Sequence, residues 1–287
     1  GGGTGVMGDR AGDLSTAAVF FITIGRPPGS TPTFCVGAPF DIVVTVNPIP
    51  AITNATLTQT FCGTGTATFT PTINVASSTY SWTSTVITGT VSGLVASGSA
   101  PVNNSLTNTG NTDAVVRYRV TPMGPATTNC VGSFVDFVVT IHPVPTVASS
   151  VASQTLCDGG VTNISLSNPN NVAGTSLDWI VTASSNVTGA SGGTGSDINQ
   201  TLSLITANAI GSVTYQITPS TSACTGSSTS VTVTVDPIPT LGLNSNTFVV
   251  CNGQTPAITL TNPNSVTGTK YIWTVSRTNV TGASNQA

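Results

Sequence analysis

A pair of cysteines 27 residues apart occurs three times and constrains the fold of the chain more than any other feature. The pairs are Cys35 with Cys62, Cys130 with Cys157, and Cys224 with Cys251. Between the cysteines of each pair lie an alternating apolar segment, a Pro-x-Pro joint and a second extended segment. Self-similarity at a fixed spacing is the signature of a chain built from repeated structural units. The sequence therefore predicts a tandem-repeat architecture.

The proline joints set the period of the repeat, which is 95 and then 94 residues. The joints are Pro48 with Pro50, Pro143 with Pro145, and Pro237 with Pro239. We interpret residues 48–142 and 143–236 as two complete modules, and residues 1–47 and 237–287 as the C-terminal half and the N-terminal half of a module. A half-module on its own would expose apolar surface and open strand edges. We therefore expect each half to be completed, either by a longer chain or by a neighbouring copy, and both arrangements yield a fibre.

Each module is predicted to be a sandwich of short strands. In the second module, apolar residues alternate along five segments, which places them on one face of a strand. These segments are residues 161–167, 176–183, 199–206, 213–218 and 230–235. About seven short strands in roughly 95 residues, separated by Gly, Asn and Pro, indicate two packed antiparallel sheets.

One tryptophan recurs in each module and is interpreted as an anchor of the core. Trp82, Trp179 and Trp273 follow the cysteines Cys62, Cys157 and Cys251 by 20 to 22 residues. A large aromatic side chain on a strand in the middle of a sandwich is most simply buried. The alternative is a stacking surface for a sugar, with Tyr80 beside Trp82 as a second contact.

The order of these motifs resembles a known group of domains. Each module runs from Cys-Gly or Cys-Asp through Tyr-Ser-Trp (80–82) or Asp-Trp-Ile (178–180). It continues through Tyr-Arg-Val-Thr-Pro (118–122) or Tyr-Gln-Ile-Thr-Pro (215–219) to a second cysteine and the proline joint. This order is similar to the PKD-like and immunoglobulin-like tandem modules of Bacteroidota surface proteins and adhesins. The resemblance implies an all-β fold of tandem immunoglobulin-like (PKD-like) β-sandwich modules in an extracellular, bacterial cell-surface setting.

Composition excludes several classes of function. Charged residues make up 5% of the chain, the net charge is −3 and no basic cluster occurs, which argues against nucleic-acid binding. No apolar run reaches the roughly 18 residues of a membrane-spanning helix. The one histidine, His142, precedes a proline where the other repeats carry Asn47 and Asp236, so we expect a solvated joint residue. We expect no catalytic residue, cofactor or metal site, and hence no enzyme.

The cysteines are candidates for structural disulfides, because six regularly spaced cysteines without a CxxC pair indicate an oxidising compartment. Two pairing schemes stay open. In one, an early cysteine of one module bonds to the late cysteine of the next, as in Cys62–Cys224, and Cys35 and Cys251 bond to neighbouring copies. In the other, the bonds lie within modules, as Cys62–Cys130 and Cys157–Cys224. An immunoglobulin-type topology favours the first scheme, because Cys62 and Cys130 would lie at opposite ends of one module.

The sequence therefore predicts a secreted structural protein of the cell surface. We expect a subunit or segment of an extracellular filament or adhesin stalk, assembled head to tail with copies of itself and stiffened by its proline joints. The alternative is an adhesin module that binds surface glycans.

Overall fold

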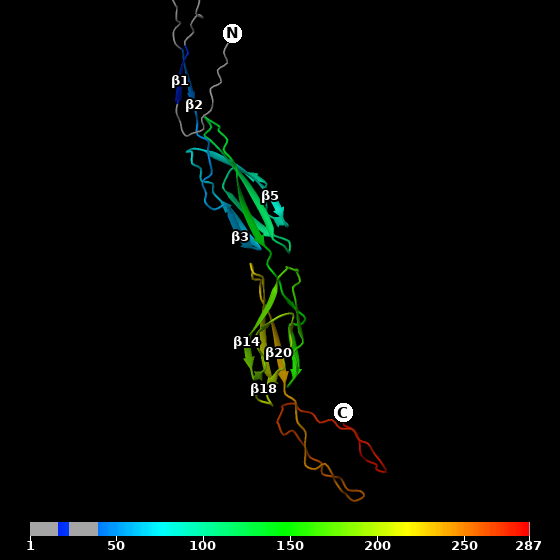
Figure 1. The fold of residues 1–287 in the computed structure, drawn as a ribbon. Helices are drawn as coiled ribbons and strands as arrows, with labels where there is room; N and C mark the ends of the chain where they lie inside the picture. Colours follow the sequence, from blue (N-terminus) through cyan, green and yellow to red (C-terminus); the bar gives the residue numbers. More distant parts are fainter. Residues whose placement is uncertain (1–16, 23–39, 287) are drawn as a thin grey trace, which may run out of the picture. The chain divides into compact units, whose positions relative to one another are not determined.

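The structure is a computed structural model that describes residues 17–22 and 40–286 (Figure 1). Among these residues every regular element is a β-strand and none is a helix. The chain divides into two compact units, residues 1–142 and 143–287. Each unit is described by itself below. We call strands β3 to β10 the first sandwich, strands β11 to β20 the second sandwich, and residues 237–286 the C-terminal segment.

The first sandwich consists of a five-stranded and a three-stranded sheet. The larger sheet has the order β3-β10-β9-β5-β7, and the smaller has the order β4-β8-β6. The larger sheet contains β3 (Thr58–Cys62), β10 (Val135–His142), β9 (Ala114–Met123), β5 (Thr79–Thr88) and β7 (Ser97–Gly98). The smaller sheet contains β4 (Thr64–Phe69), β8 (Val102–Asn108) and β6 (Val91–Ser92).

The core of the first sandwich lies between its two sheets. Along β9 buried and partly exposed residues alternate, as expected for a strand with one face on a core. Val116, Tyr118 and Val120 of β9 are fully buried and belong to the same apolar cluster as Phe69 and Leu106 of the opposite sheet. The period-2 pattern of valines therefore sets which face of each strand is inside.

The second sandwich repeats this arrangement with the same strand order. Its larger sheet has the order β12-β20-β19-β14-β16, and a three-stranded sheet β11-β13-β17 and a pair β15-β18 complete it. The larger sheet contains β12 (Ser153–Cys157), β20 (Thr229–Asp236), β19 (Gly211–Ser220), β14 (Ser176–Ser185) and β16 (Gly193–Thr194). The remaining strands are β11 (Ala148–Ser149), β13 (Ile164–Ser167), β17 (Asp197–Ile198), β15 (Val187–Thr188) and β18 (Ser203–Leu204).

In both sandwiches the first long strand pairs parallel with the last. Strand β3 pairs with β10 from Thr58↔Val138 to Cys62↔His142. Strand β12 pairs with β20 in the same way, from Ser153↔Thr232 to Cys157↔Asp236. The chain therefore enters the large sheet beside the strand by which it leaves.

The predicted fold class is confirmed, with one of the five predicted strands wrong. Strands β14, β19 and β20 contain the predicted segments 176–183, 213–218 and 230–235, and β13 forms the end of 161–167. Residues 199–206 do not form one strand. The buried Thr162 hydroxyl donates to the Ile198 carbonyl (2.7 Å) and accepts from the Gln200 amide (2.8 Å). Around these side-chain bonds the backbone forms the isolated bridge Val161↔Thr201, and the strand β18 comprises Ser203–Leu204 alone.

Two further strand pairs lie outside the sandwiches. Strand β1 (Ala17–Ile22) pairs antiparallel with β2 (Phe40–Thr45), and β21 (Gly242–Leu243) pairs with β22 (Leu260–Thr261). The register of β1 and β2, with Phe20 opposite Ile42, repeats that of β9 and β10, where Tyr118 lies opposite Phe137. The division into the four segments 1–47, 48–142, 143–236 and 237–287 stays a prediction.

The C-terminal segment exposes apolar residues whose counterparts in the second sandwich are buried. Ile164 is fully buried, whereas Ile258, the residue 94 positions later, is 54% exposed. Trp179 is 7% exposed, whereas Trp273 is 43% exposed. Trp273 was predicted to anchor a core. It does not do so here, because residues 237–286 contain no counterparts of β19 and β20, the strands that complete the core of the second sandwich.

Candidate functional site

An asparagine fastens the proline joint to the second sandwich. The Asn170 Oδ1 accepts hydrogen bonds from the Thr146 amide (3.1 Å) and the Thr146 hydroxyl (3.0 Å). The Asn170 Nδ2 donates to the carbonyl of Val144, the residue between the two prolines of the joint (2.8 Å). One side chain therefore holds the backbone on both sides of Pro145.

The same arrangement recurs at the next joint. The Asn264 Oδ1 accepts from the amide and the hydroxyl of Thr240, each at 3.0 Å, and its Nδ2 donates to the Ile238 carbonyl (2.8 Å). In the first sandwich the Asn74 Oδ1 accepts from the Ala51 amide (2.7 Å), one residue after Pro50. We call these three side chains the joint asparagines.

A glycine lies against the joint from another loop of the same sandwich. A β-carbon added to Gly226 would lie 1.9 Å from the Pro145 carbonyl oxygen, and one added to Gly132 would lie 1.8 Å from that of Pro50. Both contacts are with backbone, so no side-chain movement could relieve them. Glycine is therefore required for the loop between β19 and β20, and for that between β9 and β10, to lie this close to the joint. Pro50 and Pro145 are buried, whereas Pro48 and Pro239 are exposed.

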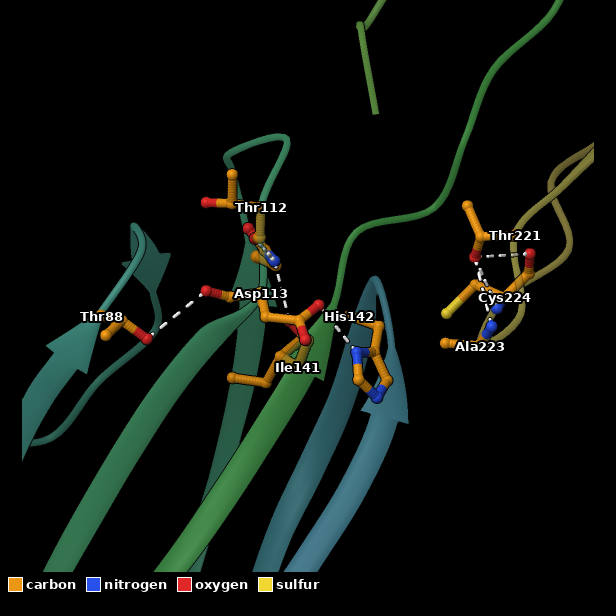
Figure 2. Close-up of polar contacts among 9 residues, drawn as sticks. Thr88, Thr112, Asp113, Ile141, His142, Thr221, Ala223 and Cys224 are labelled. Carbon is orange, nitrogen blue, oxygen red and sulfur yellow. Dashed lines mark hydrogen bonds and ion pairs between the residues drawn. The ribbon is translucent and has the colours of Figure 1, made fainter. Parts of the chain in front are cut away.

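The residue before the joint is fixed to the preceding sandwich. The His142 carbonyl accepts from the Gly63 amide (2.8 Å), and the Asp236 carbonyl accepts from the Asp158 amide (2.9 Å). Figure 2 shows the His142 ring directed at the Asp113 carboxylate, with 2.7 Å between Nδ1 and Oδ1. The expectation of a merely solvated joint residue is wrong, because this contact holds the side chain, which is 23% exposed, against its own sandwich.

Few backbone rotations stay free between these two anchors. The His142 carbonyl is bonded on one side of Pro143, and the Val144 carbonyl is bonded on the other. The proline ring fixes φ of Pro143 and the peptide bonds are planar, so that ψ of Pro143 and φ and ψ of Val144 are the three soft torsions left between the anchors. The following Pro145 restricts ψ of Val144 to extended values. The joint is thus a short connector, and each of its ends is bonded to the sandwich next to it.

The cysteines fall into two states. Cys62 and Cys224 are each in a disulfide, whereas Cys130, Cys157 and Cys251 are free thiols. The within-module pairs Cys62–Cys130 and Cys157–Cys224 are therefore not formed. Cys35 lies outside the described residues.

The loop that carries Cys224 is held by its own backbone and Thr221 (Figure 2). The Cys224 amide donates to the Thr221 hydroxyl (3.0 Å), and the Thr221 amide donates to the Cys224 carbonyl (2.8 Å). The loop ends at Gly226, whose amide donates to the Pro219 carbonyl (2.8 Å). This network fixes the position of Cys224 relative to the joint residue Pro145.

The tryptophans of the two sandwiches are core residues. Trp82 is 5% exposed, packs edge-on against Tyr118 and donates its Nε1–H to the Ala100 carbonyl (2.8 Å). Trp179 makes the equivalent bond to the Ser191 carbonyl (3.2 Å). Tyr80 is partly buried against the same core as Trp82. Neither indole ring presents a face on which a sugar could stack.

The ion pair between Arg119 and Asp136 is structural. The Arg119 Nε donates to Asp136 Oδ1 (2.9 Å) and its Nη2 to Oδ2 (3.0 Å), while the guanidinium carbon lies 3.8 Å from the centre of the Phe134 ring. The hydrogen bond from Arg119 lowers the pKa of Asp136 below its usual value. This carboxylate is therefore engaged in an ion pair between β9 and β10, an arrangement that offers no general base.

Potential metal ligands do not cluster in the described part of the chain. Across residues 17–22 and 40–286 no three His, Cys, Asp or Glu side chains gather where they could hold a metal ion. A search of the same residues for a helix long and apolar enough to cross a membrane likewise found none. The features that recur are the joints and the side chains around them.

Sequence reasoning missed the joint asparagines and the glycines. A signal was available for two of the asparagines, because Asn-Pro-Asn occurs at 168–170 and again, 94 residues later, at 262–264. The glycines follow the late cysteines by two residues, at Cys130-Val-Gly132 and Cys224-Thr-Gly226. In a chain rich in Asn and Gly these repeats become informative only when the period is already known.

Comparison with known families matches both sandwiches. The sequence profile of the PKD-like domain matches residues 59–145 and 154–239, more than half of the chain. No curated protein matches it. Matches among solved structures include the extracellular cadherin domains 1–5 of protocadherin gamma B2, at 11% identity over 86% of this chain and 52% of that one, with a TM-score of 0.28. Another match comprises the four N-terminal immunoglobulin domains of Dscam1 isoform 6.9. The identity is 10% over 71% of this chain and 51% of that one, and the TM-score is 0.32. The chain thus spans about half the length of either.

Proposed function

We propose, from the premise that the chain belongs to the PKD-like domain family, that it is a non-catalytic structural component of an extracellular adhesin or stalk. In this proposal the modules are spacers, and the joints determine how rigidly one module is connected to the next. Domains of this kind serve many functions, so the proposal is argued from the joint and not from the fold alone.

The observation that carries the proposal is the anchoring of the joint on both sides. A flexible tether between independent domains would need no bond to either neighbour. Here the His142 carbonyl is bonded to the preceding sandwich, and Asn170 bonds to the Val144 carbonyl. The next joint repeats both bonds, through the Asp236 carbonyl and Asn264. Repetition of these bonds at successive joints favours a stiff array.

Electron microscopy of single chains tests this stiffness. We expect the angle between the sandwiches to vary little in the native protein. Insertion of Gly-Gly after Val144 should broaden the distribution of this angle, because it adds four freely rotating torsions to the three already present. A native distribution as broad as that of the insertion variant would refute the proposal.

Glycan binding is the weaker candidate. Its predicted contacts were Tyr80, Trp82 or exposed loops, and the burial of Trp82 together with its bond to Ala100 removes the stacking surface at that position. No other arrangement of aromatic residues in the two sandwiches favours it. Binding of soluble chain to a glycan array, abolished by Tyr80→Ala, would reinstate this function.

Within the stalk, we propose that the exposed face of the C-terminal segment is covered by a hairpin equivalent to β19–β20. The support is the correspondence with the second sandwich, where the counterparts of Ile258, Trp273 and Val280 are buried. Strands β1 and β2 have the register of such a hairpin. The cover is supplied by a neighbouring copy or by a longer chain, in each case by addition of strands to an incomplete sheet.

Accessibility of Trp273 tests the covering of this face. In the native assembled material, all three tryptophans should resist quenching by iodide, whereas in the dilute chain one of them should be quenched. Trp273→Phe should abolish the quenched fraction. Quenching of Trp273 in the assembled material equal to that in the dilute chain would refute the covering. The mass of the reduced, denatured native protein identifies the source, because 28.7 kDa indicates a neighbouring copy and a larger mass a longer chain.

A further inference from the structure

The early cysteine of each sandwich lies beside the joint that follows that sandwich. Cys62 is the last residue of β3 and lies opposite His142, the residue before the joint. Cys157 is the last residue of β12 and lies opposite Asp236 in the same way. In both cases the residue after the cysteine donates its amide hydrogen to the carbonyl at that position, from Gly63 to His142 and from Asp158 to Asp236.

The late cysteine lies beside the joint that precedes its sandwich. Cys224 is two residues before Gly226, whose Cα lies against the Pro145 carbonyl. Cys130 has the same relation to Gly132 and the Pro50 carbonyl. The early cysteine of one module and the late cysteine of the next therefore flank one joint of three residues. Together with the residue before it, such a joint spans at most about 14 Å.

The oxidation states of the cysteines agree with these positions beside the joints. The joint at residues 143–145 is the one joint that has both a complete preceding and a complete following sandwich in the described chain. Its two flanking cysteines, Cys62 and Cys224, are the two in disulfides. Cys130 flanks the joint at 48–50 and Cys157 flanks the joint at 237–239, and both are free thiols.

We propose that the early cysteine of every module is bonded to the late cysteine of the next, so that a disulfide accompanies each joint along the array. Cys62 is then bonded to Cys224, Cys157 to the late cysteine of the following module, and Cys130 to the early cysteine of the preceding one. This inference rests on the proposed stalk. Each bond forms when two thiols transfer two electrons to a disulfide oxidant, which leaves as two thiols with the two protons.

The chain itself contains cysteines of the types required. Cys251 is of the early type, because it lies 94 residues after Cys157, and it is an exposed free thiol. Cys35 has the sequence context of a late cysteine, Cys-Val-Gly, as Cys130 has. If neighbouring copies complete the half-modules, the bonds between copies are Cys251–Cys130 and Cys157–Cys35. If the polypeptide is longer, the partners lie in its other modules.

Disulfide mapping of the native material tests the inference. The assembled protein is alkylated without reduction and digested with pepsin, because acid suppresses thiol exchange and the six Lys and Arg residues offer trypsin few sites. We expect a linked Cys62–Cys224 peptide. We also expect Cys157 linked to a late-type peptide and Cys130 linked to an early-type peptide. Linkage to Cys35 and Cys251 identifies a second copy, and linkage to peptides outside the 287 residues identifies a longer chain.

Other linkages overturn the inference. The inference fails if Cys130 is found linked to Cys157 or to Cys62. It also fails if Cys130 and Cys157 are both alkylated, and hence free, in material whose Cys62 disulfide is intact. If the arrays are stiff but Cys157 is alkylated, and hence a free thiol, the disulfide inference fails while the proposed function stands. Flexible, unassembled chains with alkylated thiols overturn the proposed function as well.

Two serine variants serve as matched controls. Cys157→Ser alters a thiol that is free in the structure, so it should leave the melting temperature of the dilute chain unchanged and remove one linkage of the assembled material. Cys62→Ser should lower the melting temperature of the dilute chain, because it opens a bond already formed.

Discussion

Replacement of Asn170 by alanine measures how strongly the joint is held to the second sandwich. The change removes three hydrogen bonds, two accepted from Thr146 and one donated to the Val144 carbonyl. A hydrogen bond contributes about 0.5–1.5 kcal/mol net. Because Asn170 is partly exposed and water replaces some of these bonds, we take the lower half of that range. The expected loss in the free energy of unfolding is about 2 kcal/mol.

Thermal unfolding and amide exchange report this loss separately. A loss of 1 kcal/mol lowers the melting temperature of a domain of this size by about 4–8 °C, so Asn170→Ala should lower it by about 10 °C. The Thr146 amide, which donates to Asn170, should exchange at least about tenfold faster, corresponding to about 1.4 kcal/mol.

The exposed Asn163 of the same sandwich provides the control. Asn163→Ala should leave both the melting temperature and the exchange of Thr146 unchanged. If Asn170→Ala behaves like this control, the joint is not held by the asparagine, and the reasoning that the stalk is stiffened there fails.

Three further predictions follow from burial and from pKa shifts. Ile164→Ala should cost about 2–5 kcal/mol in chemical unfolding, whereas Ile258→Ala, at 54% exposure, should cost little in the dilute chain; equal losses would refute the difference between the two sites. The pKa of Asp136 is lowered in the folded state from its usual value of 3.8. The ionised carboxylate therefore stabilises the fold at pH values above 3.8, and this stabilisation is lost as the pH falls below 3.8. Asp136→Asn should therefore reduce the loss of stability on acidification, and an unchanged acid profile would contradict this. Burial raises the pKa of Tyr215 to about 12 from 10.0, so its stabilising effect is complete below pH 10 and is lost as the pH rises through 12. Absorbance titration of wild type against Tyr215→Phe checks this, and a difference that titrates near pH 10 would disagree.

The fold was predictable because its information is local and repeated. Alternating valines such as Val231, Val233 and Val235 identify the inner face of β20, and all three are fully buried. The segment 199–206 was assigned wrongly, since its pattern is also alternating while the Thr162 side chain takes up the backbone groups of Ile198 and Gln200. A pattern of apolar residues does not show which partner a backbone group will bond to.

The joint was predictable in part. The prolines mark its place, but the groups that hold it come from loops distant in sequence, such as Asn170, 26 residues after Val144. The role of Gly226 depends on the approach of a loop to the Pro145 carbonyl, which no spacing in the sequence encodes. For the cysteines, sequence reasoning left two pairing schemes, and the free thiols of Cys130 and Cys157 exclude the one within modules.

The parallel pairing of the first and last long strands has a mechanical consequence. Tension on an array enters a module at the joint, reaches the large sheet through β11 and β12, and leaves at the end of β20. Since β12 and β20 run parallel in register from Ser153↔Thr232 to Cys157↔Asp236, the two points of pull lie at opposite ends of one ladder. The force then acts as shear along the strands and strains all the hydrogen bonds of the ladder together. Breaking these bonds one at a time from one end does not relieve the force. Each module should therefore extend only when the whole ladder gives way at once.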